Sequence, residues 1–246
     1  EGHRRQGGRR RRDNVVAIVG VVVVAALAAL TQIYYFSAGP GRALPSASAA
    51  PTPSPSGSAS ATGSNLGAPD PSLAANRTWT GTLTLNHTAL GIILDGAKAP
   101  QAVSGFIRDV QNSYFTGKTC HRLAESTGFG ILQCGSIDGV GGADPNYHFG
   151  PVENAPSNNV YPAGTIAMAR ASNDGYSNGH QFFIVFDQST IPADSAGGYT
   201  VIGTVTSGLD ALKSGIVTGG ITPGASGSTT DGAPKIPTTI TSVTIQ

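Results

Sequence analysis

The stretch "TCHRLAESTGFGILQCG", residues 119–135, places a histidine, an arginine, a glutamine and two cysteines close together in the chain. Its two flanks alternate apolar and polar side chains, which is typical of β-strands. They predict a hairpin whose strands carry Arg122 and Gln133. The stretch has neither a carboxylate nucleophile nor a cluster of metal ligands. The function of an arginine next to a histidine must therefore be inferred from the rest of the chain.

Outward from this hairpin, the chain from Arg77 onward combines short strand-like runs with two helical segments. Residues 99–115 repeat apolar side chains at helical spacing, and residues 207–216 predict a second helix with Ser207 as its N-cap. Residues 218–237 are rich in Gly, Ser, Thr and Pro and predict a loop. The predicted strands are 78–86, 91–96, 119–124, 130–135, 164–171, 180–187, 199–205 and 238–246.

This order of elements lacks the strand–helix alternation of parallel-sheet proteins. It favours a mainly β fold, an antiparallel barrel or sandwich with two helices covering its openings. Residues 77–246 are enough to enclose one substantial hydrophobic core.

Three further segments are predicted before this body. Residues 1–14 form a basic tail, because the first 13 residues carry a net charge of +4 while the whole chain carries +1. Residues 15–36 are uncharged, and a helix of that length at about 1.5 Å per residue matches a hydrocarbon core of about 30 Å. Residues 37–76 are a Ser/Pro/Ala-rich linker that has too few apolar side chains to fold.

The basic tail is expected to stay in the cytoplasm, which makes residues 15–36 a single-pass membrane anchor and places the body outside the cytoplasm. A cleaved signal peptide is the alternative, although its apolar region usually has only about 7–15 residues. The body itself is mildly acidic and gives no reason to expect nucleic acid as a partner.

Six segments of the body, in order along the chain, resemble the cyclophilin-type peptidyl-prolyl cis-trans isomerases. They are "CHRL" (120–123), "ILQCG" (131–135), "GVGG" (139–142), "TIAMARA" (165–171), "NGHQFFIVF" (178–186) and "YTVIGTV" (199–205). With the predicted anchor, and with 11 Arg against 4 Lys, the chain is most similar in plan to a bacterial, membrane-anchored member. The resemblance implies a closed eight-stranded antiparallel barrel capped by two helices.

The resemblance also implies the reaction, isomerisation of X-Pro bonds in exported or membrane-proximal proteins, without a cofactor or a metal. Arg122 is expected to donate a hydrogen bond to the proline nitrogen in the twisted state, with Gln133 and His121 as further catalytic residues. Phe183, Met168 and Ile131 are expected to hold the proline ring. The other implied substrate-binding residues are Phe129, Gly139, Ala169, Arg170, Gln181, Ile191 and Tyr199, of which Ala169 and Arg170 would offer backbone groups to the peptide.

The chain departs from the family pattern around the apolar pocket. The family has a Phe three residues before the strand glutamine, where this chain has Gly130, with Phe129 one residue earlier. Tyr199 stands where many members have a histidine. The only tryptophan is Trp79 near the first strand, so Ile191 is expected to replace a pocket tryptophan. The displaced Phe and the missing tryptophan favour an alternative, a weakly catalytic or non-catalytic proline-peptide-binding chaperone or scaffold on the same barrel. A third interpretation is an anchored interaction module whose ligand is the chain's own proline-rich linker.

The two cysteines allow two interpretations. If the hairpin forms, Cys120 and Cys134 lie nearly opposite each other, and a disulfide is favoured outside the cytoplasm over two free thiols. A zinc site that also used His121 and His148 is disfavoured, because Cys120 and His121 are neighbours and point to opposite faces of a strand. A serine hydrolase is disfavoured because no Gly-x-Ser-x-Gly turn occurs. The expected state is a monomer whose partners are proline-containing segments of client proteins and the membrane.

Overall fold

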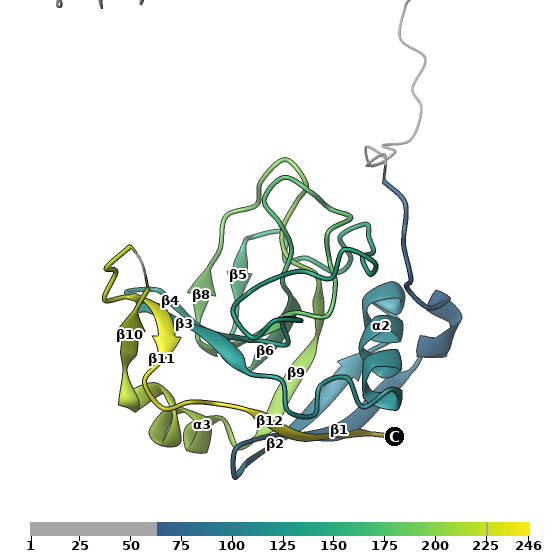
Figure 1. The fold of residues 1–246 in the computed structure, drawn as a ribbon. Coiled ribbons are helices and arrows are strands. Elements are labelled where there is room, and N and C mark those ends of the chain that lie inside the picture. The colour runs from purple at the N-terminus through teal and green to yellow at the C-terminus, as the bar shows by residue number, and fades with distance from the viewer. Residues whose placement is uncertain (1–62, 225) are drawn as a thin grey trace, which may run out of the picture. The chain divides into compact units, whose positions relative to one another are not determined.

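The structure, a computed structural model, describes residues 63–224 and 226–246 (Figure 1). The predicted basic tail, the predicted anchor at residues 15–36 and most of the predicted linker lie outside the described residues. Within the described part of the chain, no helix is both long enough and apolar enough to cross a membrane.

Ten strands form one antiparallel sheet in the order β10-β11-β3-β4-β7-β6-β9-β2-β1-β12, and β5 pairs with β8 separately. The strands are β1 (Thr78–Leu85), β2 (Thr88–Asp95), β3 (Cys120–Ser126), β4 (Phe129–Cys134), β5 (Val160–Tyr161), β6 (Thr165–Met168), β7 (Phe182–Asp187), β8 (Ser189–Thr190), β9 (Val201–Ser207), β10 (Ile221–Pro223), β11 (Asp231–Pro234) and β12 (Ile240–Ile245). The helices are α2 (Pro100–Gln111) and α3 (Leu209–Gly215), with two short 3-10 helices, η1 (Pro71–Ala74) and η2 (Val217–Gly219).

The prediction of a closed eight-stranded barrel is wrong, because the sheet has ten strands and its edge strands β10 and β12 form no ladder with each other in the described residues. The segment before β12 contacts the beginning of β3, the third strand of the sheet, only locally. Thr119 and Thr239 form an isolated bridge, and the Cys120 N–H donates to the Thr238 carbonyl at 2.9 Å. Strands β10 and β11 arise from residues 218–237, which the sequence predicts to be a loop because they lack an apolar alternation.

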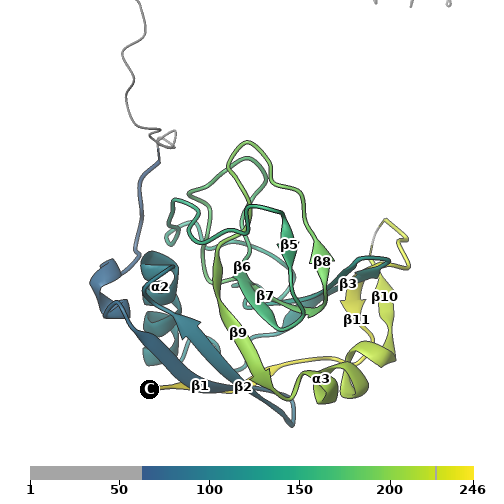
Figure 2. The same cartoon turned by 180° about the vertical axis from the view of Figure 1, so that it is seen from behind.

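The sheet buries apolar side chains on both of its faces. The main core packs α2 and α3 against one face and contains Phe106, Leu123 and Phe182. A second, smaller cluster lies on the other face and contains Phe183. Phe182 and Phe183 thus lie on opposite faces, as the alternation of side chains along a strand predicts for residues 180–187. Figures 1 and 2 show α2 beside β1 and β2, with the β10–β11 pair at the other end of the sheet.

Helix α2 takes its N-terminal cap from a distant part of the chain. It begins at Pro100, whose missing N–H is no loss at this position, and its N-cap residue Ala99 offers no side-chain acceptor. Glu153 supplies the acceptor instead: its carboxylate accepts the N–H groups of Gln101 and Ala102 at 3.0 and 2.9 Å. This contact anchors the loop between β4 and β5 to the helix.

Candidate active site

A β-bulge in β3 sets which residues face the site. Cys120 is opposite Cys134 and Arg122 is opposite Gln133, so His121 is an extra residue without a partner in the register. In a regular strand Cys120 and Arg122 would share a face, but one inserted residue reverses the faces beyond it. Cys120 therefore lies in the main core, whereas Arg122 lies with Gln133 on the opposite face.

His121, the bulged residue, is half-buried beside residues 139–142, the Gly-rich loop. A side chain at Gly141 would begin 3.5 Å from its imidazole ring. Its Nδ1 is buried and has no hydrogen-bond partner among the described residues. Burial lowers the pKa of His121, partly offset by the nearby Asp138 carboxylate. The ring is therefore neutral near pH 7 and acts as a wall of the site rather than as a second cation.

A chain of side-chain amides connects the Gly-rich loop to Arg122. Arg122 Nη1 donates to Gln133 Oε1 at 3.2 Å, and Gln133 Nε2 donates to Gln181 Oε1 at 2.9 Å. Gln181 Nε2 then donates to the carbonyls of Gly141 and Gly142, both at 3.0 Å. The guanidinium can only donate and the carbonyls can only accept, so both ends dictate how each amide is oriented. The chain thereby holds Arg122 in one orientation.

Substituting Gln181 by glutamate replaces the N–H donor to Gly141 and Gly142 with an oxygen acceptor. This change should lower kcat/KM for an X-Pro peptide about tenfold, the equivalent of about 1.4 kcal/mol. The carboxylate has no N–H to give and would face the carbonyl oxygens of Gly141 and Gly142, so the anchor of this loop is lost, while the bond accepted from Gln133 Nε2 can remain. A peptide isomerisation assay measures the effect. Gln111→Glu, the same change at the exposed end of α2, is the control, and equal activity of the two variants would contradict this role of Gln181.

Asp231 completes the surroundings of Arg122 from the other side. Its carboxylate accepts Nε and Nη2 of Arg122 at 2.8 and 2.7 Å, a two-bond arrangement. The pair raises the pKa of Arg122 and lowers the pKa of Asp231. The sequence alone does not indicate Asp231, which is 109 residues from Arg122 and lies in the segment predicted as a loop. Its one signal is that it is the only carboxylate within residues 218–237.

The second apolar cluster lies on the same face of the sheet as Arg122 and contains most of the expected pocket residues. Phe183 and Ile131 are buried in it, and the ring centroids of Phe183 and Tyr199 are 5.5 Å apart in an edge contact. The partly exposed members of the cluster form an apolar surface with an accessible rim. Those members are Phe129, Ala169, Ile191, Tyr199 and Val201.

Phe129 reaches this cluster because of the alternation of β4. Phe129, Ile131 and Gln133 share one face of the strand, while Gly130 faces the other way. A Cβ atom at Gly130 would lie 2.7 Å from the ring of Phe186, so a larger residue does not fit at that position. The ring of Phe186 therefore occupies the space beside Gly130, the position where the family has a Phe. Phe129, one residue earlier in the chain, contributes its side chain to the apolar surface instead.

One expected substrate-binding residue, Met168, is placed differently by the structure. Met168 is opposite Phe182 and lies in the main core, so it does not contribute to the apolar surface, where Ala167 takes that place in β6. The Arg170 side chain is fully buried and bound to Asp194. The N–H of Ala169 donates to the Gln181 carbonyl at 2.9 Å, which leaves only its carbonyl for a peptide.

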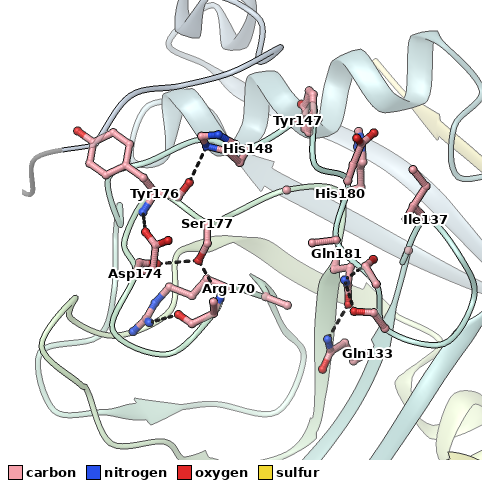
Figure 3. Close-up of a pocket in the computed structure, with 18 of the residues that line it drawn as sticks. Gln133, Ile137, Tyr147, His148, Arg170, Asp174, Tyr176, Ser177, His180 and Gln181 are labelled. Carbon is pink, nitrogen blue, oxygen red and sulfur yellow. Dashed lines mark hydrogen bonds and ion pairs between the residues drawn. The ribbon is translucent and has the colours of Figure 1, made fainter.

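A cavity of about 590 Å³ adjoins the amide chain. Gln133 and Gln181 lie side by side on one of its walls, and His180 and Tyr147 line another (Figure 3). His180 is stacked between Tyr114 and Tyr147, with centroid distances of 3.9 and 4.0 Å. A second cavity, about 850 Å³, includes Gly139, His121 and Arg122. Arg122 lines this second cavity, and Gly139 is another of its lining residues.

Cys120 and Cys134 are joined to each other by a disulfide. Neither sulfur is free as a thiolate ligand, which excludes the zinc site considered from the sequence. Among the described residues no group of three or more His, Cys, Asp or Glu side chains could hold a metal ion. The bridge connects the two strands that carry Arg122 and Gln133.

Comparison with known proteins gives concordant matches. A family profile described as "Cyclophilin type peptidyl-prolyl cis-trans isomerase/CLD" matches residues 81–245. The "Probable peptidyl-prolyl cis-trans isomerase B" of Mycobacterium leprae (strain TN) is 34% identical over 178 residues, which cover 68% of this chain and 56% of that protein. The protein of the same name from Mycobacterium tuberculosis (strain ATCC 25618 / H37Rv) is 34% identical over 177 residues, 66% of this chain and 53% of that protein. The chain thus spans little more than half the length of these relatives.

Solved structures show the same fold. A crystal structure of a Cryptosporidium parvum cyclophilin type peptidyl-prolyl cis-trans isomerase superposes with a TM-score of 0.55 at 22% identity, covering 69% of this chain and 98% of that one. A second, determined in the presence of the dipeptide ala-pro, has a TM-score of 0.53 at 24% identity over 68% of this chain and 98% of that one.

Proposed function

The chain belongs to the cyclophilin-type peptidyl-prolyl cis-trans isomerase family, and on that premise we propose that it accelerates rotation about X-Pro bonds at Arg122. The observation that carries the proposal is the position of this guanidinium. It is held between Asp231 and Gln133 on the same face as the apolar surface around Phe183.

The chemistry needs no proton transfer and no covalent intermediate. The barrier of about 18–20 kcal/mol to X-Pro rotation comes from amide resonance, which is lost as the bond twists. The nitrogen lone pair is then free to accept a hydrogen bond, so a donor placed at that nitrogen stabilises the twisted state more than the planar one. Arg122 uses three of its five N–H groups on Asp231 and Gln133, which leaves one on Nη1 and one on Nη2.

The apolar surface supplies the other half of the site. Packing of the proline ring against Phe183, Ile131 and Phe129 would bury apolar area that is the same for both isomers, and would bring the nitrogen beside the guanidinium. The relative whose structure was determined in the presence of ala-pro supports a short proline peptide as the ligand class.

The test is the rate of cis-trans exchange in a short peptide with one X-Pro bond, measured with the full chain by NMR exchange spectroscopy. The uncatalysed exchange takes tens to hundreds of seconds, so acceleration is readily detected. Acceleration proportional to enzyme concentration supports the proposal. Binding of the peptide without acceleration would instead establish the alternative of a proline-peptide-binding scaffold, which the displaced Phe at position 129 and the missing pocket tryptophan favour.

The proposed place of action is outside the cytoplasm, on exported or membrane-proximal clients, with residues 15–36 as the anchor. The uncharged run and the arginines before it support this orientation. The disulfide between Cys120 and Cys134 also supports it, because such bonds persist in oxidising compartments. Protease digestion of intact cells tests the orientation: the body should be cleaved without lysis, and protection would contradict it.

A further inference from the structure

Arg122 binds Asp231 in addition to Gln133, and Asp231 is not part of the chain of amides. Its two bonds to Nε and Nη2 occupy one edge of the guanidinium, and Gln133 holds Nη1. We infer that Asp231 is a positioning residue that aims the two remaining N–H groups of Arg122 at the proline nitrogen. The inference rests on the proposed isomerase function and deepens it.

Two effects of this carboxylate oppose each other. Its charge offsets that of the guanidinium and weakens the field at the proline nitrogen, whereas its two parallel bonds remove the rotational freedom of a long side chain. The first effect is small here, because Arg122 and Asp231 side chains are 38% and 44% exposed and water screens the pair. The twisted amide also develops a directional lone pair rather than a net charge, so the direction of the N–H matters more than the strength of the field. Positioning should therefore dominate.

A purely structural role for the pair is disfavoured by the backbone around it. Strand β11 is already attached to β3 by the register pairs of Asp231 with Ala124 and of Gly232 with Leu123. The Glu125 N–H also donates to the Thr230 carbonyl at 2.9 Å. A half-exposed ion pair adds little to stability beyond these contacts. The variants below should therefore fold.

The first experiment compares Asp231→Asn and Asp231→Glu with Asp187→Asn in the full chain. Asp187 pairs with Lys213 in a similarly exposed ion pair, so it controls for loss of one surface carboxylate. Asp231→Asn should lower kcat about tenfold with KM within about twofold, because an amide cannot accept both N–H groups. Asp231→Glu should recover part of kcat, and Asp187→Asn should match the wild type. An unchanged or higher kcat in Asp231→Asn, or a loss confined to KM, overturns the inference.

The second measurement does not depend on turnover. The Arg122 Nε–H signal in ¹⁵N-labelled protein should be protected from solvent exchange in the wild type and in Asp187→Asn, and should lose protection in Asp231→Asn. If the wild type fails to accelerate isomerisation but this pattern holds, the proposed function fails while the positioning of Arg122 stands. If the wild type is active and Nε–H is equally unprotected with and without the carboxylate, the positioning role fails while the function stands.

Discussion

Arg122→Lys is expected to lower kcat/KM for an X-Pro peptide about a hundredfold, the equivalent of about 2.7 kcal/mol of transition-state stabilisation. Lysine keeps the positive charge, so the substitution separates charge from geometry. Arg122 gives two N–H groups to Asp231 and one to Gln133, and needs a fourth for the proline nitrogen. An ammonium has three N–H groups in all and no fork to match the carboxylate. It cannot replace the guanidinium at this site.

Arg108→Lys is the matched control for this substitution, because Arg108 is exposed on α2 and the same chemical change is made away from the site. Peptide affinity, measured by chemical-shift titration, should change little in Arg122→Lys, since the apolar surface around Phe183 is intact. A variant that retains more than about a third of the wild-type kcat/KM would show that charge alone is enough, and would remove the amide chain and Asp231 from the account of catalysis.

The sequence predicted those parts of the site that depend on local periodicity. Alternation in residues 180–187 correctly separated Phe182 from Phe183, because successive side chains of a strand point to opposite faces. Strands β3 and β4 pair as a hairpin that carries Arg122 and Gln133, as its two alternating flanks indicate, whereas the pairing of these two residues depends on the bulge at His121. Helix α2 lies within residues 99–115 because apolar spacing over three turns is a strong signal.

The parts that the sequence could not predict depend on register and on long-range pairing. A bulge at His121 adds one residue to β3, and no local pattern shows where a bulge will fall. The resemblance implies that Met168 lies beside Phe183, but the pairing of Met168 with Phe182 places it in the main core instead. Closure of the sheet depends on whether its edge strands meet in register, which periodicity does not reveal. Asp231 reaches Arg122 only through the pairing of β11 with β3.

Removing the disulfide is expected to have the largest effect on stability. The double substitution of Cys120 and Cys134 by alanine should lower the free energy of unfolding by about 3 kcal/mol, because the bridge closes a loop of about 15 residues in the unfolded chain. For a folded body of this size the melting temperature should fall by roughly 6–12 °C. Both cysteines are buried in the main core, so part of the loss will come from the missing sulfur atoms rather than from the missing bond.

Reduction of the wild type separates these two contributions, because it breaks the bond and keeps both sulfurs. Urea unfolding with and without reductant should show a lower midpoint for the reduced wild type, while the double alanine variant should not respond to reductant. Alkylation of the unreduced, unfolded wild type should add no label to its intact mass. Two added labels would show that the bridge is absent in solution. A wild-type midpoint that is insensitive to confirmed reduction would show that pairing of β3 with β4, and not the covalent bond, holds Arg122 opposite Gln133.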